Sequence, residues 1–348
     1  MKILIATVFA VAIVAAPAWS QTSKPSSVTD LASYTGSDRE QLLFEGAKRE
    51  GKLVWYTTLA AEQNKQIARA FEAKYRGVRV ETYRTDATGL IQRVLTEAKA
   101  RRHLVDAIET TLPALMTFRA NQLLMPYTSP QLAQYPEDSK EKGPKELVYW
   151  TIDRESFVGF GYNKNRLGGA DIPKNFDGLL RPSLKDKMAM AGGATGAQMI
   201  GAMLKAKGEG FVMRLKEQNM RLHMIAASAL TQLVASGEVI ASPTQFYSAT
   251  HVAIAKGAPL VWAPMDLVVA TSGGAAVYAH AQRPHAALLF VDSLLSPEGQ
   301  NLFEDLYFGT AQKDYGFKRW EPQKGLTIDQ YEKEHEKWLK LLMEVTRK

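Results

Sequence analysis

Three strand-then-helix units follow one another in the first third of the chain, and this order restricts the fold more than any other feature. The predicted strands cover residues 52–56, 78–83 and 105–108, and a helical pattern follows each of them. Consecutive units of this kind form a mostly parallel sheet through right-handed crossovers. A second alternating set occupies residues 187–247. The sequence therefore predicts an α/β fold with two lobes, each a mostly parallel sheet flanked by helices.

Two short apolar runs separate and rejoin these sets. Residues 157–163 are rich in aromatic residues and valine, which is typical of a buried strand, and residues 259–263 form a similar run. We interpret the two runs as hinge strands that cross between the lobes beside a cleft. The first lobe is then expected to comprise residues 37–155 plus 262–348, and the second lobe residues 156–261. A length of 348 residues agrees with two lobes.

The N-terminus has the features of a signal peptide. Lys2 precedes an apolar run over residues 3–16, which is too short for a good transmembrane span, and small residues follow up to Ser20. We expect cleavage near Ser20, which gives residues 1–20 as the signal peptide and residues 21–36 as a poorly ordered leader. The chain is therefore predicted to be exported to a Gram-negative periplasm.

Composition excludes several other classes. The chain has no cysteine, so disulfides, thiolate metal sites and a lipid anchor on an N-terminal cysteine are excluded. The net charge is +7, but Lys and Arg are scattered rather than clustered. We therefore expect no nucleic-acid partner and no direct membrane anchor, and only a general preference for anionic small molecules.

Enzyme signatures are absent from the sequence. There is no H-E-x-x-H motif, no G-x-S-x-G elbow and no phosphate-binding loop, and His280 and His285 are poorly spaced for metal ligation on a helix. We predict that the chain is not an enzyme and carries no cofactor. A secreted α/β hydrolase is an alternative, but it would need a nucleophile, base and acid that the sequence does not offer.

Small and hydroxyl residues recur where a strand ends and a helix begins. In open α/β sheets ligands bind at such positions, because free backbone N–H groups and the helix dipole attract anions. Each position alone is more often a plain helix cap. Arg84 ends the second strand and offers a positive charge, and Asp266 follows the return strand. The candidate ligand contacts are Thr57, Thr58, Arg84, Thr88, Glu109, Thr110, Thr111, Ala194, Thr195, Gly196, Tyr247 and Asp266.

Five segments in order give the chain a family resemblance. They are residues 53–59, 70–75, 158–165, 232–238 and 286–300. With these segments the chain resembles the periplasmic solute-binding proteins of ABC importers, in the branch that includes ferric-ion, thiamine, phosphonate and sugar-phosphate binders. The resemblance implies a type II periplasmic-binding-protein fold that closes on a small ligand, a monomer, a permease in the inner membrane as partner, and no catalysis. A signalling or chemosensory partner is a further hypothesis.

The resemblance also raises the question of iron. Ferric binders of this branch use two adjacent tyrosines, which are represented here by Phe246 and Tyr247, often with a carboxylate from the third strand-helix loop. Glu109 lies in that loop, but Thr111 stands opposite the iron-binding carboxylate. Ferric iron prefers several anionic oxygen ligands. We therefore rank a small organic anion ahead of iron, and keep a metal site of Tyr247 and Glu109 as the alternative.

Overall fold

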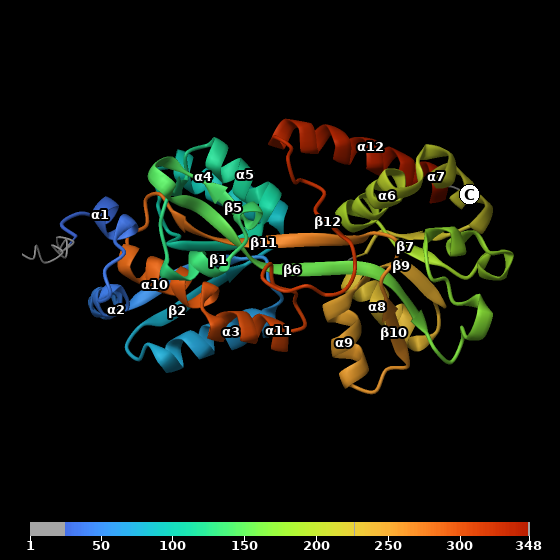
Figure 1. The fold of residues 1–348 in the computed structure, drawn as a ribbon, viewed down its shortest axis with the longest axis horizontal. Coiled ribbons are helices and arrows are strands. Elements are labelled where there is room, and N and C mark those ends of the chain that lie inside the picture. The colour runs from blue at the N-terminus through green and yellow to red at the C-terminus, as the bar shows by residue number, and fades with distance from the viewer. Residues whose placement is uncertain (1–24, 226, 347–348) are drawn as a thin grey trace, which may run out of the picture.

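The computed structural model describes residues 25–225 and 227–346, and the chain forms two lobes side by side (Figure 1). One sheet passes through both lobes, with the main strand order β10-β6-β11-β3-β1-β2. The strands are β1 (Lys52–Thr57), β2 (Arg79–Arg84), β3 (Ala107–Thr111), β4 (Leu124–Met125), β5 (Lys140–Lys142), β6 (Val148–Asn163), β7 (Ala189–Ala191), β8 (Arg221–His223), β9 (Ala241–Phe246), β10 (Leu260–Ala263), β11 (Val268–Tyr278) and β12 (Arg319–Trp320). The helices are α1 (Val28–Ser33), α2 (Arg39–Glu50), α3 (Ala61–Lys74), α4 (Ala87–Lys99), α5 (Leu112–Ala120), α6 (Gly193–Lys207), α7 (Glu209–Arg214), α8 (Ala227–Ser236), α9 (Tyr247–Ala255), α10 (Pro284–Leu295), α11 (Pro297–Asp305) and α12 (Ile328–Thr346).

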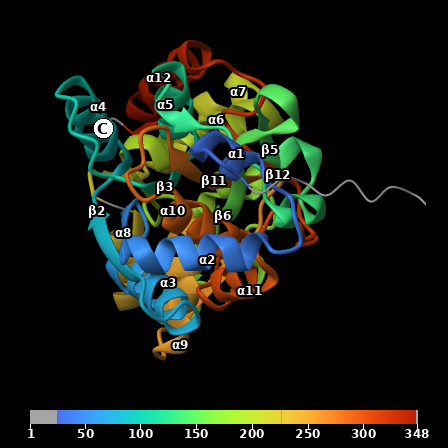
Figure 2. The ribbon, with the colours of Figure 1, turned by 90° about the vertical axis from the view of Figure 1, so that its left-hand side faces the viewer.

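The first lobe is built on the parallel strands β3, β1 and β2, and the helices α3, α4 and α5 follow β1, β2 and β3. Neighbouring residues of β1 point to opposite faces, as the two-residue period of a strand requires. Trp55 packs with α3 and α10 on one face, and Tyr56 packs with α4 and α5 on the other. Figure 2 looks onto the outer end of this lobe, where α2 lies across it beside α3.

Two long antiparallel strands join the lobes. β6 and β11 pair along residues 151–158 and 269–275, and they run across the middle of the molecule in Figure 1. Residues 157–163, the predicted first crossing strand, form the second half of β6. The predicted return strand at residues 259–263 is wrong, because this segment is β10 and pairs with β6 inside the second lobe. The true return strand, β11, carries a Thr-Ser-Gly-Gly stretch at residues 271–274 and so lacks the apolar pattern that guided the prediction.

The second lobe repeats the strand-then-helix order, with α6, α8 and α9 following β7, β8 and β9. β7 and β8 are parallel as expected, whereas β9 and β10 both run antiparallel to β6. The backbone N–H of Ala191, at the end of β7, donates to Thr244 Oγ1 on β9 over 2.9 Å. The carboxyl ends of β7 and β9 therefore lie next to each other, and they present the starts of α6 and α9 together.

The N-terminal segment differs from the prediction of a poorly ordered leader. Residues 1–20, the predicted signal peptide, lie outside the described residues, but α1 forms within residues 25–36 and buries Leu31. The buried guanidinium of Arg39 donates to the carbonyl oxygens of Leu31 and Tyr34 and pairs with Asp292 of α10 over 2.8 Å. This arginine holds the segment against the first lobe.

The C-terminal helix also differs from its predicted place. After α11 the chain crosses back along β11 through β12, and α12 then packs on α6 (Figure 1). Its buried face, which includes Trp338 and Leu342, belongs to the core of the second lobe, whereas the sequence pattern places residues 262–348 in the first lobe. Among the helices of residues 25–225 and 227–346, none combines the length and apolar character that a bilayer crossing requires.

Candidate functional site

The carboxyl ends of the first-lobe strands bring three of the predicted contacts into one row. Thr57 at the end of β1 is directly opposite Arg84 of β2 on one side and Glu109 of β3 on the other. On β11, Gly273 pairs with Thr111 in one direction and with Arg154 of β6 in the other. The row therefore lies at the level of the middle of the crossing strands, where the two lobes meet.

Glu109 is fully buried and already has partners on both carboxylate oxygens. Thr57 Oγ1 donates to Oε2 over 2.6 Å, and Nε and Nη2 of Arg154 both lie 2.8 Å from Oε1. Arg154 also donates to Ser156 Oγ over 3.2 Å. Glu109 thus anchors the hinge strand β6 to the first lobe. Our sequence reasoning missed Arg154 and Ser156, although the polar stretch between two apolar halves of β6 was a visible signal.

The remaining first-lobe candidates differ in what they can offer. The hydroxyls of Thr58 and Thr110 are buried and have no hydrogen-bond partner within the described part of the chain. Thr111 precedes α5 without capping it through its side chain. Thr88 is exposed in the first turn of α4, which Asp86 caps instead by accepting from the N–H of Gly89.

Arg84 is exposed, and only its Nε is engaged, donating to the carbonyl oxygen of Leu59 at 3.3 Å. Its terminal nitrogens have no hydrogen bond or ion pair to any residue that the structure describes. The guanidinium is therefore a cation held at the end of β2 and open to solvent.

The second lobe presents two helix starts without a side-chain cap. Gly192 precedes α6 and Phe246 precedes α9, and neither residue caps its helix. Ala194 is exposed and Thr195 is half-buried, so the first turn of α6 is open. Gly196 is different, because an added Cβ would lie 2.1 Å from the carbonyl oxygen of Ala191. Gly196 serves the packing of α6 on β7.

Tyr247, the first residue of α9, is half-buried in a group of aromatic rings. Its ring centroid lies 3.9 Å from that of His251, 5.2 Å from that of Trp262 and 6.4 Å from that of Phe157. The ring of His251 lies 5.6 Å from that of Tyr307, which follows α11 of the first lobe. These rings connect the lobes on the α9 side of the crossing strands, and His251 and Trp262 were not predicted.

The structure places Asp266 away from the other candidates. Its carboxylate accepts from the backbone N–H of Phe176 and pairs with Lys207 over 3.0 Å. Lys207 ends α6, about 20 Å along the helix axis from its first residue. Burial works to raise the pKa of Asp266, but these partners outweigh it and lower the pKa below the usual value. Asp266 is therefore a structural residue of the second lobe.

A charged group fastens the C-terminal segment to the hinge. Arg319 of β12 pairs with Glu155 of β6, whose backbone N–H donates to the carbonyl oxygen of Gly309 over 2.7 Å. Glu155 is buried, and burial raises its pKa to about 7, although the charge and hydrogen bond of Arg319 oppose this shift. The carboxylate of Glu321 adds to the increase, and Lys324 opposes it.

Comparisons with known proteins agree with this architecture. A family model described as "Bacterial extracellular solute-binding protein" matches residues 110–333. No curated protein sequence matches the chain. Similar solved structures include iron-bound HitA from Pseudomonas aeruginosa (22% identity, TM-score 0.66) and AfuA from Actinobacillus pleuropneumoniae with fructose-6-phosphate bound (19%, 0.66). A third is the spermidine/putrescine ABC transporter substrate-binding protein PotD from Streptococcus pneumoniae (13%, 0.65). Each match covers 85% of this chain and 99% of the other, and at these identities it shows the shared fold alone.

Gly273 is predicted to be essential for the ion pair at the row of strand ends. An added Cβ would lie 2.7 Å from Glu109 Oε1 and 2.8 Å from Arg154 Cζ, so Gly273→Ala must displace both groups. We expect a loss of about 1–3 kcal/mol in the free energy of unfolding, measured with urea. Gly168→Ala is the control, because its added Cβ meets nothing within 4 Å. Equal effects of the two changes would contradict the prediction.

Glu155 is predicted to make stability depend on pH. Its pKa is about 7 in the folded chain against a usual value of 4.5, so the folded chain holds this proton more tightly than the unfolded chain does. This contribution to stability is complete below pH 4.5 and is lost as the pH rises through 7. Relative to the parent, Glu155→Gln should therefore gain about 3 kcal/mol between pH 4.5 and pH 8, measured by urea unfolding. A pH-independent difference would refute the assignment.

Proposed function

Because the chain belongs to the bacterial extracellular solute-binding proteins, whose family model covers well over half of it, we propose that it captures a small anionic solute between its lobes and delivers it to the permease of an ABC importer. Two observations carry this proposal, namely the row of polar strand ends in the first lobe and the helix starts without a side-chain cap in the second lobe, which the two crossing strands join.

Capture would proceed by closure of the lobes. A solute that contacts both lobes binds the closed form better than the open form, so it shifts the population toward closure. The backbone of β6 and β11 would bend while their pairing and the Glu109–Arg154 ion pair keep the hinge intact. Closure needs only one copy of the chain, so we expect a monomer.

An anion suits the groups that we assign to the cleft. The starts of α5, α6 and α9 offer backbone N–H groups that no side chain of the preceding residue caps, and Arg84 offers a positive charge. Glu109 would not repel the solute strongly, because Arg154 compensates its charge. These groups fit a phosphonate, a phosphate ester or a carboxylate.

A ferric ion or ferric chelate is the second candidate, and Tyr247 at the start of α9 is the observation in its favour. Glu109 would have to leave Arg154 and Thr57 in order to bind a bare ion. No group of three or more His, Asp or Glu side chains stands at metal-binding distance within residues 25–225 and 227–346. Because Glu109 is already held by Thr57 and Arg154, we rank the organic anion first.

The wider context follows from the family. We propose that the chain is exported to the periplasm and acts without catalysis or cofactor. We also propose that it binds no nucleic acid and has no membrane anchor of its own. A hydrolase would need a nucleophile with a base beside it, and the row at the strand ends contains instead a carboxylate held by an arginine.

A thermal-shift screen of the mature chain tests the ligand. The panel would hold phosphonates, phosphate esters, dicarboxylates, thiamine and ferric citrate. A ligand at 100 times its dissociation constant adds about 2.7 kcal/mol, which raises the melting temperature by several degrees. Arg84→Ala should weaken an anionic hit by roughly tenfold to a hundredfold, because a charge-assisted hydrogen bond is lost.

Arg76→Ala is the matched control, since Arg76 is an exposed arginine in the turn before β2, at the opposite ends of the strands. An anion that binds the Arg84 and Arg76 variants equally would refute the anion cleft. A response to iron alone that disappears in Tyr247→Phe would establish the ferric alternative, and no response to any compound would contradict solute capture.

A further inference from the structure

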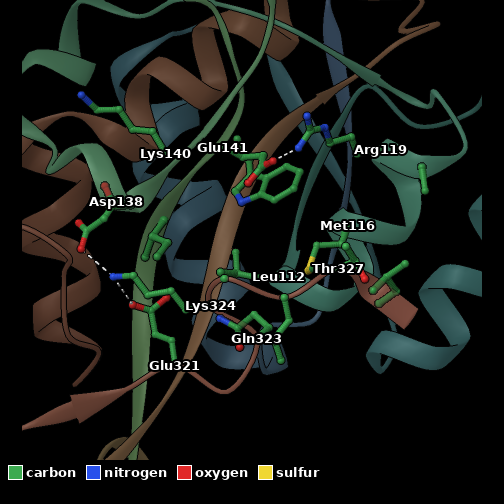
Figure 3. A pocket seen from close by; sticks show the side chains of 17 residues that line it. Leu112, Met116, Arg119, Asp138, Lys140, Glu141, Glu321, Gln323, Lys324 and Thr327 are labelled. Carbon is green, nitrogen blue, oxygen red and sulfur yellow. Dashed lines mark hydrogen bonds and ion pairs between the residues drawn. The ribbon is translucent and has the colours of Figure 1, made fainter. Parts of the chain in front are cut away.

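A pocket of about 650 Å³ lies beside the hinge on the α5 side of the first lobe (Figure 3). Its volume is in the range of small-molecule sites. None of the predicted ligand contacts lines it. One wall comes from α5, β5 and β6 of the first lobe, and the other comes from residues 321–328, which follow β12 and reach the first residue of α12. Since α12 packs on α6, the second wall is attached to the second lobe.

The α5 and β6 part of the pocket wall is mainly apolar, and the charged side chains that line the pocket are paired. Leu112, Met116, Trp150 and Ile152 supply the apolar surface of the first wall. At the rim Arg119 pairs with Glu141, and Lys324 pairs with Asp138 over 2.6 Å, as the dashed lines in Figure 3 mark. A charged ligand would meet no unpaired opposite charge there and would lose its hydration, so these walls favour a neutral molecule.

Gln323 offers a hydrogen-bond donor in the pocket. The side chain lines the pocket, and the residue is only 5% exposed. Its amide nitrogen has no hydrogen-bond partner among the described residues, which is uncommon for a buried polar group. The last torsion of a glutamine is broad, so a small rotation can turn the amide toward a ligand. A carbonyl or hydroxyl oxygen on the ligand would satisfy it.

We propose that this pocket is a second ligand site, which takes a neutral amphipathic molecule with an aromatic or branched aliphatic body and a carbonyl or hydroxyl group directed at Gln323. The body packs against Met116, Trp150 and Ile152. The site differs from the solute cleft proposed above, because none of the predicted ligand contacts lines it and it shares with that cleft only the start of α5, through Leu112. Its occupant lies between the first lobe and the segment that leads to α12.

The test uses Prodan, a neutral naphthalene ketone whose fluorescence moves to shorter wavelength when it leaves water. Titration of the mature chain should give a saturable blue shift with one molecule bound per chain. Met116→Trp fills the pocket and should abolish the shift. Gln66→Trp, at an exposed position of α3, is the control for an added tryptophan and should leave the shift unchanged.

Gln323→Leu gives a second variant that keeps the size of the side chain. It should weaken Prodan binding about fivefold and at the same time raise the melting temperature of the free chain, because an unpaired buried amide is removed. A residue with only a structural role would not give these opposite signs.

Arg84→Ala and Tyr247→Ala place the binding site. Unchanged Prodan binding in both variants supports the pocket, whereas loss of binding in either one would move the ketone into the cleft and overturn the proposal. Titration without saturation, or parental affinity in Met116→Trp, would overturn it as well.

Discussion

The buried ion pair between Glu109 and Arg154 is the interaction on which the arrangement of the two lobes depends. It joins β3 of the first lobe to β6, the strand that enters the second lobe. The side chain of Glu109 is 0% exposed and that of Arg154 is 6% exposed. Removing one partner of such a pair leaves an uncompensated charge, which is far more destabilising than the pair is stabilising. The neighbouring Asp153 lies in the same buried region, where burial and then the charge of Glu109 raise its pKa well above the usual range.

Much of the fold could be predicted from local patterns, because short segments are enough to identify alternating apolar residues and helix starts. The three strand-helix units of the first lobe and the run at residues 157–163 were found in this way. The return strand was misplaced because residues 271–274 interrupt the apolar pattern of β11, and the glycine at position 273 leaves room for the adjacent Glu109–Arg154 ion pair. The place of α12 depends on the partner that its apolar face meets, and periodicity identifies such a face without naming that partner.

For the candidate site, the sequence predicted which residues lie near one another better than it predicted their contacts. Thr57, Arg84 and Glu109 come together because parallel strands align their carboxyl ends, which is a property of the topology. The engagement of Glu109 by Arg154, and of Asp266 by Lys207, depends on contacts between residues far apart in the sequence. Such contacts decide whether a charged side chain is free to meet a solute, and residue type alone does not reveal them.

After β6 and β11, the chain passes between the lobes a third time through β12, and this path affects how closure can be observed. The described chain begins on the outer end of the first lobe with α1, and it ends with α12 on the second lobe. Fluorescent donor and acceptor groups placed at these two ends would therefore move with different bodies. Energy transfer between the two labels would therefore report the angle between the lobes as they close.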